Sequence, residues 1–244
     1  MDLGLKGRRA LVTGASKGLG KAVAAALSAE GAAVAICARD PNRTHAAARE
    51  IGAVGIVADL SVVNGVEPLL RQAIERLGGI DILVVNTGGP LGANFDGVTD
   101  DMWRQAFEGL WISTVQLIRG SLPGMKKRRW GRILVVTSVS AVEPLPNLAI
   151  SNALRPGLHG LLNDLSRDVA KHGVTVNALM PGYTATERLR DLGIDDAKVA
   201  ATVPAQRLGR PEEFAALATF LASEPAGYIC GQAIACDGGY LRSI

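Results

Sequence analysis

Short runs of apolar residues alternate with segments of helical pattern along the whole chain. In most runs no polar residue alternates with the apolar ones, which is typical of strands buried on both faces of a parallel sheet. Strands separated by helices predict a three-layer, doubly wound α/β fold with a parallel sheet of about seven strands. The runs lie at residues 10–12, 33–36, 53–57, 82–85, 133–136, 174–179 and 232–235. Helices are expected over 18–30, 41–50, 62–77 and 100–126, and in a segment ending near Lys171.

Length and composition favour one domain that covers residues 1–244, because no linker, repeat or low-complexity stretch divides the chain. No apolar run approaches the roughly 18 residues that span a bilayer, so no membrane segment is expected. The three cysteines form no CxxC pair, which favours reduced thiols in a cytoplasmic protein and no disulfide or metal site. The stretch 185–222 interrupts the alternation. We expect two helical pieces there, joined by a loop at 192–196, and the greatest mobility in the chain.

The net charge of +3 is too small to imply nucleic acid as a partner. One basic run, residues 126–129, fits phosphate binding, but cations also suit the carboxyl end of a helix, where they face the negative end of its dipole. We favour the helix end because a strand at 132–136 follows directly. Nucleic-acid binding through 126–132 would be revealed by strongly salt-dependent affinity.

The first apolar run leads directly into a glycine-rich loop, Thr13–Gly20, and then into a helix. Glycines spaced GxxxGxG between a strand and a helix are far more specific than an isolated glycine pattern. Gly14 permits the tight turn, while Gly18 and Gly20 let a pyrophosphate approach the positive end of the helix dipole. The sequence therefore predicts a dinucleotide-binding fold of the Rossmann type.

The end of the second strand distinguishes between the two nicotinamide dinucleotides. NAD sites usually place an acidic residue there to bind the ribose 2′-hydroxyl. Here Ala38 occupies that place and Arg39 follows, and an arginine fork suits a 2′-phosphate. Lys17 in the glycine loop is expected to add a second positive charge. NADP(H) is the favoured cofactor and NAD(H) the less favoured one; the alternative interpretation is two unrelated surface cations.

Further motifs follow the glycine-rich loop along the chain: Asp59-Leu60, Asn86-Thr87-Gly88-Gly89, Gly131-Arg132-Ile133, Pro181-Gly182 with Thr186, and Asp237-Gly238-Gly239. With these motifs the chain resembles the short-chain dehydrogenase/reductase family over almost its whole length, most closely the β-ketoacyl carrier-protein reductase branch. The resemblance implies that Asp59 contacts adenine and that the segment 181–186 closes over the nicotinamide. The cofactor-binding residues that loop and resemblance together indicate are Gly14, Ser16, Lys17, Gly18, Leu19, Gly20, Arg39, Asp59, Leu60, Asn86, Gly88, Arg155, Pro181, Gly182, Thr184 and Thr186.

The family performs its chemistry with a Ser, a Tyr, a Lys and an Asn, and only the first has a match here. Ser138 stands at the Ser position, Ser151 and Arg155 at the Tyr and Lys positions, and Leu110 at the Asn position. A seryl hydroxyl ends several ångströms short of a tyrosyl hydroxyl and lacks a phenol's pKa of about 10. Arg155 is expected to hold the nicotinamide ribose and to stay charged above about pH 12, so it cannot share protons as a tuned lysine does. Leu110 removes the polar anchor of a relay water.

Pro156 directly follows Arg155 in the segment expected to carry the site. Because proline removes a helical N–H and disfavours helix at the residue before it, the helix either kinks there or begins at Pro156. Both outcomes would re-aim Arg155 unless the kink is absorbed. Tyr183, beside the nicotinamide pocket, is the first candidate for a replacement acid; Glu143 and His159 are weaker, and His159 is more typical of a subunit interface. The candidate catalytic residues are Ser138, Ser151, Arg155 and Tyr183.

Two functions are compatible with these residues. The first is an NADP(H)-dependent oxidoreductase acting on a carbonyl/alcohol pair, similar to 3-oxoacyl reductases but with an altered tetrad. The second is an NADP(H)-binding protein with little or no turnover, serving as a sensor or as a partner subunit. Ser138 and the complete cofactor motifs favour the first function, whereas Leu110, Ser151 and Arg155 favour the second.

The resemblance also implies a substrate lid over about 185–210 and a small carbonyl or acyl substrate. Within the lid, residues 187–204 combine Leu, Ile and Ala side chains with two arginines. That mixture fits an apolar acyl or ring substrate bearing an anion, and it fits an amphipathic surface helix equally well. By resemblance we expect a homo-oligomer, a tetramer or dimer, paired through the two long helices.

Overall fold

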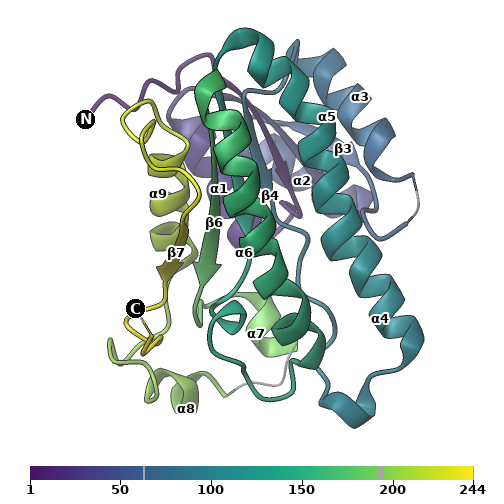
Figure 1. The fold of residues 1–244 in the computed structure, drawn as a ribbon, viewed down its shortest axis with the longest axis vertical. Coiled ribbons are helices and arrows are strands. Elements are labelled where there is room, and N and C mark those ends of the chain that lie inside the picture. Colours follow the sequence, from purple (N-terminus) through teal and green to yellow (C-terminus); the bar gives the residue numbers. More distant parts are fainter. Residues whose placement is uncertain (63, 192–194, 244) are drawn as a thin grey trace.

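The computed structural model describes residues 1–62, 64–191 and 195–243. Its strands are β1 (Arg9–Thr13), β2 (Ala33–Ala38), β3 (Val54–Val57), β4 (Ile82–Val85), β5 (Gly131–Val136), β6 (Val174–Pro181) and β7 (Ala233–Cys236). They form one parallel sheet in the order β3-β2-β1-β4-β5-β6-β7. Figure 1 shows this sheet behind the helices α5 and α6. Because the order reverses direction between β1 and β4, the predicted doubly wound α/β fold with seven strands is confirmed. Of the predicted loop at 192–196, residues 192–194 lie outside the described residues.

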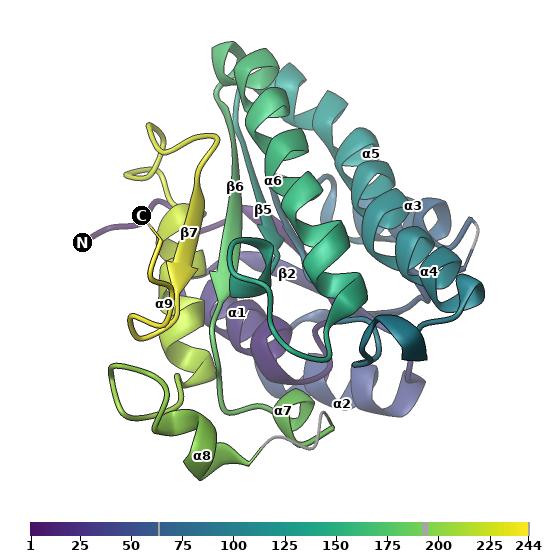
Figure 2. The same cartoon turned by 60° about the horizontal axis from the view of Figure 1, so that its bottom comes forward.

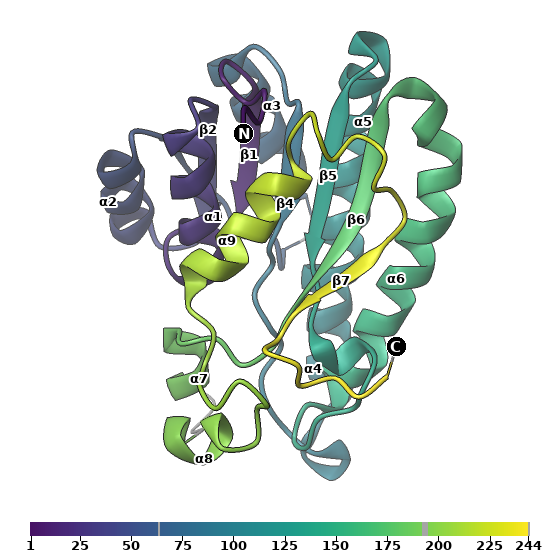
Figure 3. The ribbon, with the colours of Figure 1, turned by 90° about the vertical axis from the view of Figure 1, so that its left-hand side faces the viewer.

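Helices cover both faces of this sheet. They are α1 (Gly18–Ala29), α2 (Pro41–Ile51), α3 (Val66–Leu77), α4 (Asp100–Ala106), α5 (Ser113–Arg128), α6 (Ala149–Val169), α7 (Glu187–Asp191), α8 (Asp196–Ala200) and α9 (Pro211–Leu221). Figure 3 shows α1 and α9 on one side of the sheet and α5 and α6 on the other. One apolar core, with Leu27 and Phe214, lies under α1, α2 and α9, and a second, with Leu69 and Leu117, lies under α3, α5 and α6. No helix in the described part of the chain is long and apolar enough to cross a membrane.

Local signals explain several helix ends. Asp40 caps α2 by accepting a hydrogen bond from the backbone N–H of Arg43 at 3.0 Å, and Pro41 occupies the first turn, where it blocks no helical bond. The helix ends at Gly52 in the left-handed conformation, with φ of 67°. The basic run at 126–128 forms the last turn of α5, as predicted.

The expected long helix over 100–126 is helical throughout, from Asp100 to Arg128, but a π-helical segment, Phe107–Ile112, separates α4 from α5. Ser113 and Thr114 donate their hydroxyls to the carbonyls of Gly109 and Leu110 at 2.6 and 2.5 Å. Such bonds to the carbonyl four residues earlier compete with the regular backbone pattern and bend helices. A π-helical segment is also rare and is often found at functional sites.

The helix α6 does not begin at Pro156; it runs through this residue without a break. Tertiary contacts hold the turn before Pro156. The side chain of Asn152 bonds to both backbone groups of Leu145, at 3.1 and 2.8 Å. Two residues on, the indole of Trp111 donates to the carbonyl of Leu154 at 2.9 Å. These bonds compensate for the hydrogen bond that proline cannot donate in the helix. The sequence pattern alone does not reveal them.

Candidate functional site

The glycine-rich loop and the segments after β4 and β5 lie at one edge of the sheet. The strand register places Val12 beside Val84 and Val84 beside Leu134, so the chain leaves β1, β4 and β5 at neighbouring points. Figure 2 shows α7 and α8 at the same end of the molecule, where β6 and β7 terminate. In doubly wound folds, ligands bind at the carboxyl ends of the strands where the strand order reverses.

Asn86 fixes the shape of the glycine loop. Its backbone N–H donates to Thr13 Oγ1 at 2.9 Å and its Nδ2 donates to the carbonyl of Gly14 at 3.1 Å. Gly14 has φ of 56°, and a Cβ there would lie 2.2 Å from the Asn86 carbonyl oxygen. A Cβ at Gly20 would lie 2.5 Å from the Gly14 oxygen. Both positions therefore exclude any larger residue, and Asn86, predicted to bind cofactor, holds the loop itself.

The amino end of α1 is open toward a ligand. Lys17 precedes the helix and supplies no side-chain cap, so the first helical N–H groups remain available to a phosphate. Ser16, Gly18 and Leu19 belong to the same loop and first turn. A Cβ at Gly18 would lie 3.7 Å from Thr186 Cγ2, which brings the loop after β6 over the glycine loop. These residues fit the pyrophosphate of a dinucleotide.

The two cations predicted for a 2′-phosphate have different surroundings. Arg39 is exposed directly after β2. The Nζ of Lys17 lies 2.6 Å from Glu187 and 3.9 Å from Asp191, and both carboxylates belong to α7. Arg43 also reaches Glu187, at 3.6 Å. Lys17 therefore pairs with α7 in this structure, and a role for it at the 2′-phosphate stays a prediction.

The remaining predicted cofactor residues follow strand ends at the same edge. Asp59 and Leu60 come after β3, and Asp59 Oδ1 accepts hydrogen bonds from the backbone N–H and hydroxyl of Ser61 at 2.9 and 2.7 Å. Gly88 follows β4. The end of β6 and the loop after it hold Pro181, Gly182, Thr184 and Thr186.

Three serines and one arginine form the centre of the site. Ser151 Oγ lies 2.9 Å from Ser140 Oγ and accepts a hydrogen bond from Arg155 Nε at 3.1 Å. Ser138 Oγ accepts from the backbone N–H of Ser140 at 3.1 Å. The structure thus brings three of the predicted catalytic residues, Ser138, Ser151 and Arg155, into one cluster. Ser140 was missed, although it lies only two residues after Ser138.

Arg155 points into the protein. Its guanidinium donates to the carbonyls of Val136 and Thr137 at 3.0 and 2.5 Å and to that of Gly88 at 3.3 Å. No carboxylate among the described residues lies within ion-pair distance of it. Burial, and to a smaller extent the charge of Arg188, lower the pKa of Arg155 to about 10. At neutral pH Arg155 remains a cation.

Leu110 and two of the candidate acids are engaged elsewhere. Leu110 is buried in the core beneath α5 and carries no polar atom that could anchor a water. His159 Nε2 lies 2.9 Å from Thr137 Oγ1, and burial, followed by the charge of Arg155, lowers its pKa. Glu143 accepts hydrogen bonds from the backbone N–H groups of Arg242 and Ser243 at 2.7 and 3.0 Å and so anchors the carboxyl-terminal segment.

Tyr183, the first candidate for a replacement acid, packs edge-on against Tyr240 with ring centroids 5.2 Å apart. Burial and the hydrogen bond to Tyr240 raise the pKa of Tyr183 to about 12. A phenol with a raised pKa is a weaker acid at neutral pH, whereas catalysis calls for a lowered one. The geometry therefore gives Tyr183 no activating partner. No group of three or more potential metal ligands occurs within the described residues.

These features define the class of protein. The glycine loop and the strand order are those of a dinucleotide-binding α/β fold, and the clustered hydroxyls form a polar site at the ends of its strands. A family profile described as "Enoyl-(Acyl carrier protein) reductase" matches residues 14–241. The chain is 36% identical over 240 residues to the 3-oxoacyl-[acyl-carrier-protein] reductase FabG of Escherichia coli, covering 97% of this chain and 98% of that one. It is 33% identical to dehydrogenase/reductase SDR family member 4 of Sus scrofa, with 96% and 88% covered.

Two solved structures are similar to this chain over all or nearly all of their length. The L-sorbose reductase of Gluconobacter frateurii, complexed with NADPH and L-sorbose, has a TM-score of 0.93 at 33% identity, with 100% of both chains covered. A 3-oxoacyl (acyl-carrier-protein) reductase of Agrobacterium tumefaciens with NADP bound has a TM-score of 0.92 at 33% identity, with 98% and 96% covered. The chain belongs to the short-chain dehydrogenase/reductase family of oxidoreductases.

Proposed function

We propose that this protein is an NADP(H)-dependent oxidoreductase that acts on a carbonyl/alcohol pair, similar to 3-oxoacyl carrier-protein reductases. One observation carries the proposal: a buried cation, Arg155, contacts the hydroxyl of Ser151 beside Ser138, at the strand edge that holds the glycine loop. The NADPH- and NADP-bound relatives and Arg39 support NADP(H) over NAD(H).

Charge stabilisation is the chemistry that these residues can supply. When bound, NADPH delivers a hydride to the substrate carbonyl. The hydroxyls of Ser138 and Ser151 can donate hydrogen bonds to the carbonyl oxygen, and the cation of Arg155 favours the negative charge that develops there. No side chain of the cluster is a strong proton donor at neutral pH, so the final proton is assigned to solvent. General acid catalysis typically contributes about 10²–10⁴-fold, which sets the cost of its loss.

The segment 185–210 is proposed as the substrate lid. It leaves and rejoins the body of the protein at one place, because the backbone N–H of Ala185 donates to Gly209 O at 2.9 Å and that of Gly209 donates to Tyr183 O at 2.9 Å. The helices α7 and α8 lie between these ends. A segment closed at its base can change position over the site without disturbing the sheet.

A second candidate function is NADP(H) binding with little or no turnover. Ser151 is only 5% exposed and its hydroxyl already bonds to Ser140 and Arg155, while Tyr183 lacks an activating partner. The two candidates are separated by titrating NADPH and NADH by fluorescence and then following NADPH consumption against a panel of ketones and acyl thioesters. Consumption of NADPH supports the reductase; binding without consumption across the panel supports the second candidate.

Arg39→Glu is expected to weaken NADPH binding by about 10- to 100-fold while changing NADH binding much less. A charge-assisted hydrogen bond to the 2′-phosphate is lost, at about 1.5–3 kcal/mol, and a like charge replaces it. Dissociation constants from fluorescence titration provide the measurement. Arg49→Glu, on α2, makes the same charge change and serves as the control. Equal loss for NADPH and NADH would contradict the assignment of Arg39.

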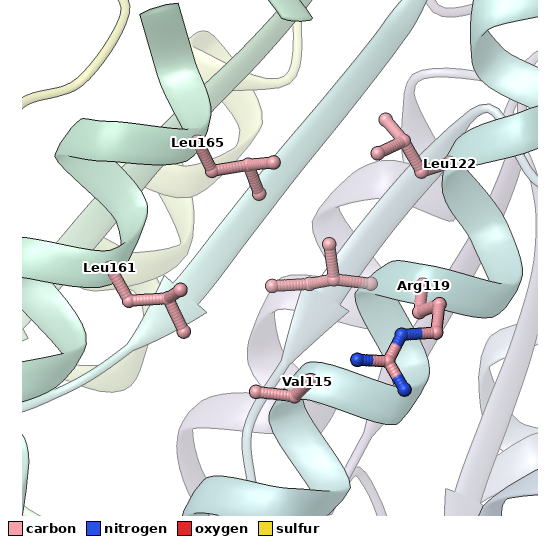
Figure 4. Close-up of a pocket in the computed structure, with 6 residues that line it drawn as sticks. Val115, Arg119, Leu122, Leu161 and Leu165 are labelled. Atoms are coloured by element: carbon pink, nitrogen blue, oxygen red, sulfur yellow. The ribbon is translucent and has the colours of Figure 1, made fainter. Parts of the chain in front are cut away.

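A second copy of this chain is proposed to cover the outer face of α5 and α6. A groove of about 210 Å³ lies between the two helices, lined by Val115, Ile118, Arg119, Leu122, Leu161 and Leu165. Figure 4 shows Leu161 and Leu165 on one wall facing Val115 and Leu122 on the other. The groove lies apart from the glycine loop, and a two-fold axis across it would pair like surfaces.

Leu161→Glu is expected to dissociate the oligomer, raising its dissociation constant at least about 100-fold, because a carboxylate would be buried in a contact whose lining is apolar except for Arg119. Light scattering coupled to size-exclusion chromatography measures the mass. Ile74→Glu, at a 43% exposed apolar residue on α3, introduces the same charge outside the groove and should leave the mass unchanged. A monomeric wild-type protein would overturn the proposal.

A further inference from the structure

Two arginine side chains from different helices converge on the segment after β4. Arg155 of α6 donates through NH2 to the carbonyl of Gly88 at 3.3 Å. Arg188 of α7 donates through NH2 to the carbonyl of Pro90, two residues further along. The charge of Arg188 acts on Arg155, so the two guanidinium groups lie near enough to repel each other. The cluster of Ser138, Ser140 and Ser151 thus has two cations beside it, at the segment 88–90.

The backbone accommodates Arg188 closely. A Cβ at Gly89 would lie 3.0 Å from NH2, 3.3 Å from Nε and 3.4 Å from Cζ of this arginine, so the guanidinium packs against the glycine. Arg188 is half-buried, and burial lowers its pKa. The side chain is therefore held in place beside the site and is not extended into solvent.

The positive charge of the pair is not neutralised within the described residues. Neither Arg155 nor Arg188 has a carboxylate within ion-pair distance there. Asp191 is the carboxylate whose charge acts on Arg188, but it is 57% exposed and lies nearer to Lys17. Two like charges removed from water without a counter-charge are costly. An anion bound between them would relieve that cost.

Free donors point to Arg188 as the binding group. Arg155 uses its Nε, NH1 and NH2 on Ser151 and on three backbone carbonyls. Arg188 has five N–H groups. Only one of them has an acceptor among the described residues, the carbonyl of Pro90. The others can form a bidentate contact with a carboxylate, which is the geometry that guanidinium groups favour.

We propose that Arg188, reinforced by the charge of Arg155, binds an anionic group of the substrate, which makes an apolar oxo acid the substrate class. The term substrate rests on the oxidoreductase function proposed above. An apolar cluster begins directly after Ser138: Val139, Leu145 and Met180 are buried, with Leu148 and Tyr183 packed against them. The diphosphate of the cofactor is the other possible anion. The uncapped amino end of α1, directly after β1, already offers it free backbone N–H groups.

The test compares acids with their esters. The kcat/KM with NADPH is measured for benzoylformate and 4-oxo-4-phenylbutanoate and for the methyl ester of each. The wild type is expected to prefer at least one acid over its ester by about 10- to 100-fold, and Arg188→Gln should lower that ratio at least about 10-fold. Arg188→Lys, which keeps the charge, should retain most of the preference. Arg71→Gln removes an exposed arginine of α3 and should leave the ratio unchanged.

A binding measurement separates this subsite from the catalytic proposal. Calorimetry of the NADP⁺-saturated protein with benzoylformate and with its methyl ester requires no turnover. Acid binding that weakens in Arg188→Gln supports the subsite even if NADPH is never consumed. Equal binding of acid and ester by the wild type, or an unchanged acid-to-ester ratio in Arg188→Gln, would overturn it. A loss of NADPH affinity in Arg188→Gln as large as the loss of acid affinity would also overturn it, because the guanidinium would then bind the diphosphate of the cofactor.

Discussion

Arg155→Met is expected to lower the free energy of unfolding by about 3 kcal/mol. The buried carbonyls of Val136 and Thr137 lose their side-chain donor, and a buried unsatisfied acceptor costs about 1–3 kcal/mol, whereas the carbonyl of the exposed Gly88 can bond to water instead. Relief of the burial cost of the guanidinium, and of its repulsion by Arg188, offsets part of this sum. Urea unfolding followed by circular dichroism measures the difference.

Arg155→Lys is the matched control for this change. Its ammonium has three donors and keeps the positive charge, so it should recover more than half of the lost stability. A change below about 1 kcal/mol in Arg155→Met would show that the three carbonyls find other donors. Arg155 would then be dispensable for the fold, and its burial would have to be explained by the cofactor alone.

The double change Ser151→Tyr with Arg155→Lys is expected to raise kcat by about 10²–10⁴-fold on any carbonyl compound that the wild type reduces. It supplies a phenol whose pKa a neighbouring lysine can lower, and it does so beside Ser138, which is already in place. The measurement is the initial rate of NADPH consumption at saturating substrate.

Ser151→Phe with Arg155→Lys is the control for the added ring. It has the bulk of the tyrosine without the hydroxyl and should give no increase in kcat. If the tyrosine variant folds and binds NADPH but consumes none, the remaining frame does not position a carbonyl. That result would favour the binding protein without turnover over the reductase.

The cofactor loop could be predicted from local sequence because its constraints are local. Glycine at Gly14 and Gly20 is required by φ and by contacts within a few ångströms, which leave a clear signature between a strand and a helix. The strands could also be predicted, since burial on both faces removes polar residues from the central runs, such as β4 and β5. The departures at Ser151 and Arg155 are predicted by counting from Ser138 along the family pattern, and the one at Leu110 from its place in the long helix; all three stay predictions.

The features that could not be predicted from the sequence depend mostly on contacts between residues distant in the chain. The continuity of α6 through Pro156 depends on Asn152 and Trp111, whose partners lie 7 and 43 residues away in the chain. The π-helical segment before α5 follows from two hydroxyl bonds whose direction no residue pattern specifies. Likewise, the sequence around Tyr183 does not reveal that its ring packs against Tyr240, which lies near the carboxyl terminus.

By itself the sequence determined the layered sheet and the glycine loop, and it predicted the positions at which the family's catalytic side chains are replaced. Only the tertiary structure decided that Arg155 turns inward to three carbonyls and that Arg188 meets it from α7 across the segment 88–90. The reason is physical: periodicity and loop chemistry act over a few residues. The electrostatics of a site depend on which distant charges share a buried volume and which backbone groups remain to be paired.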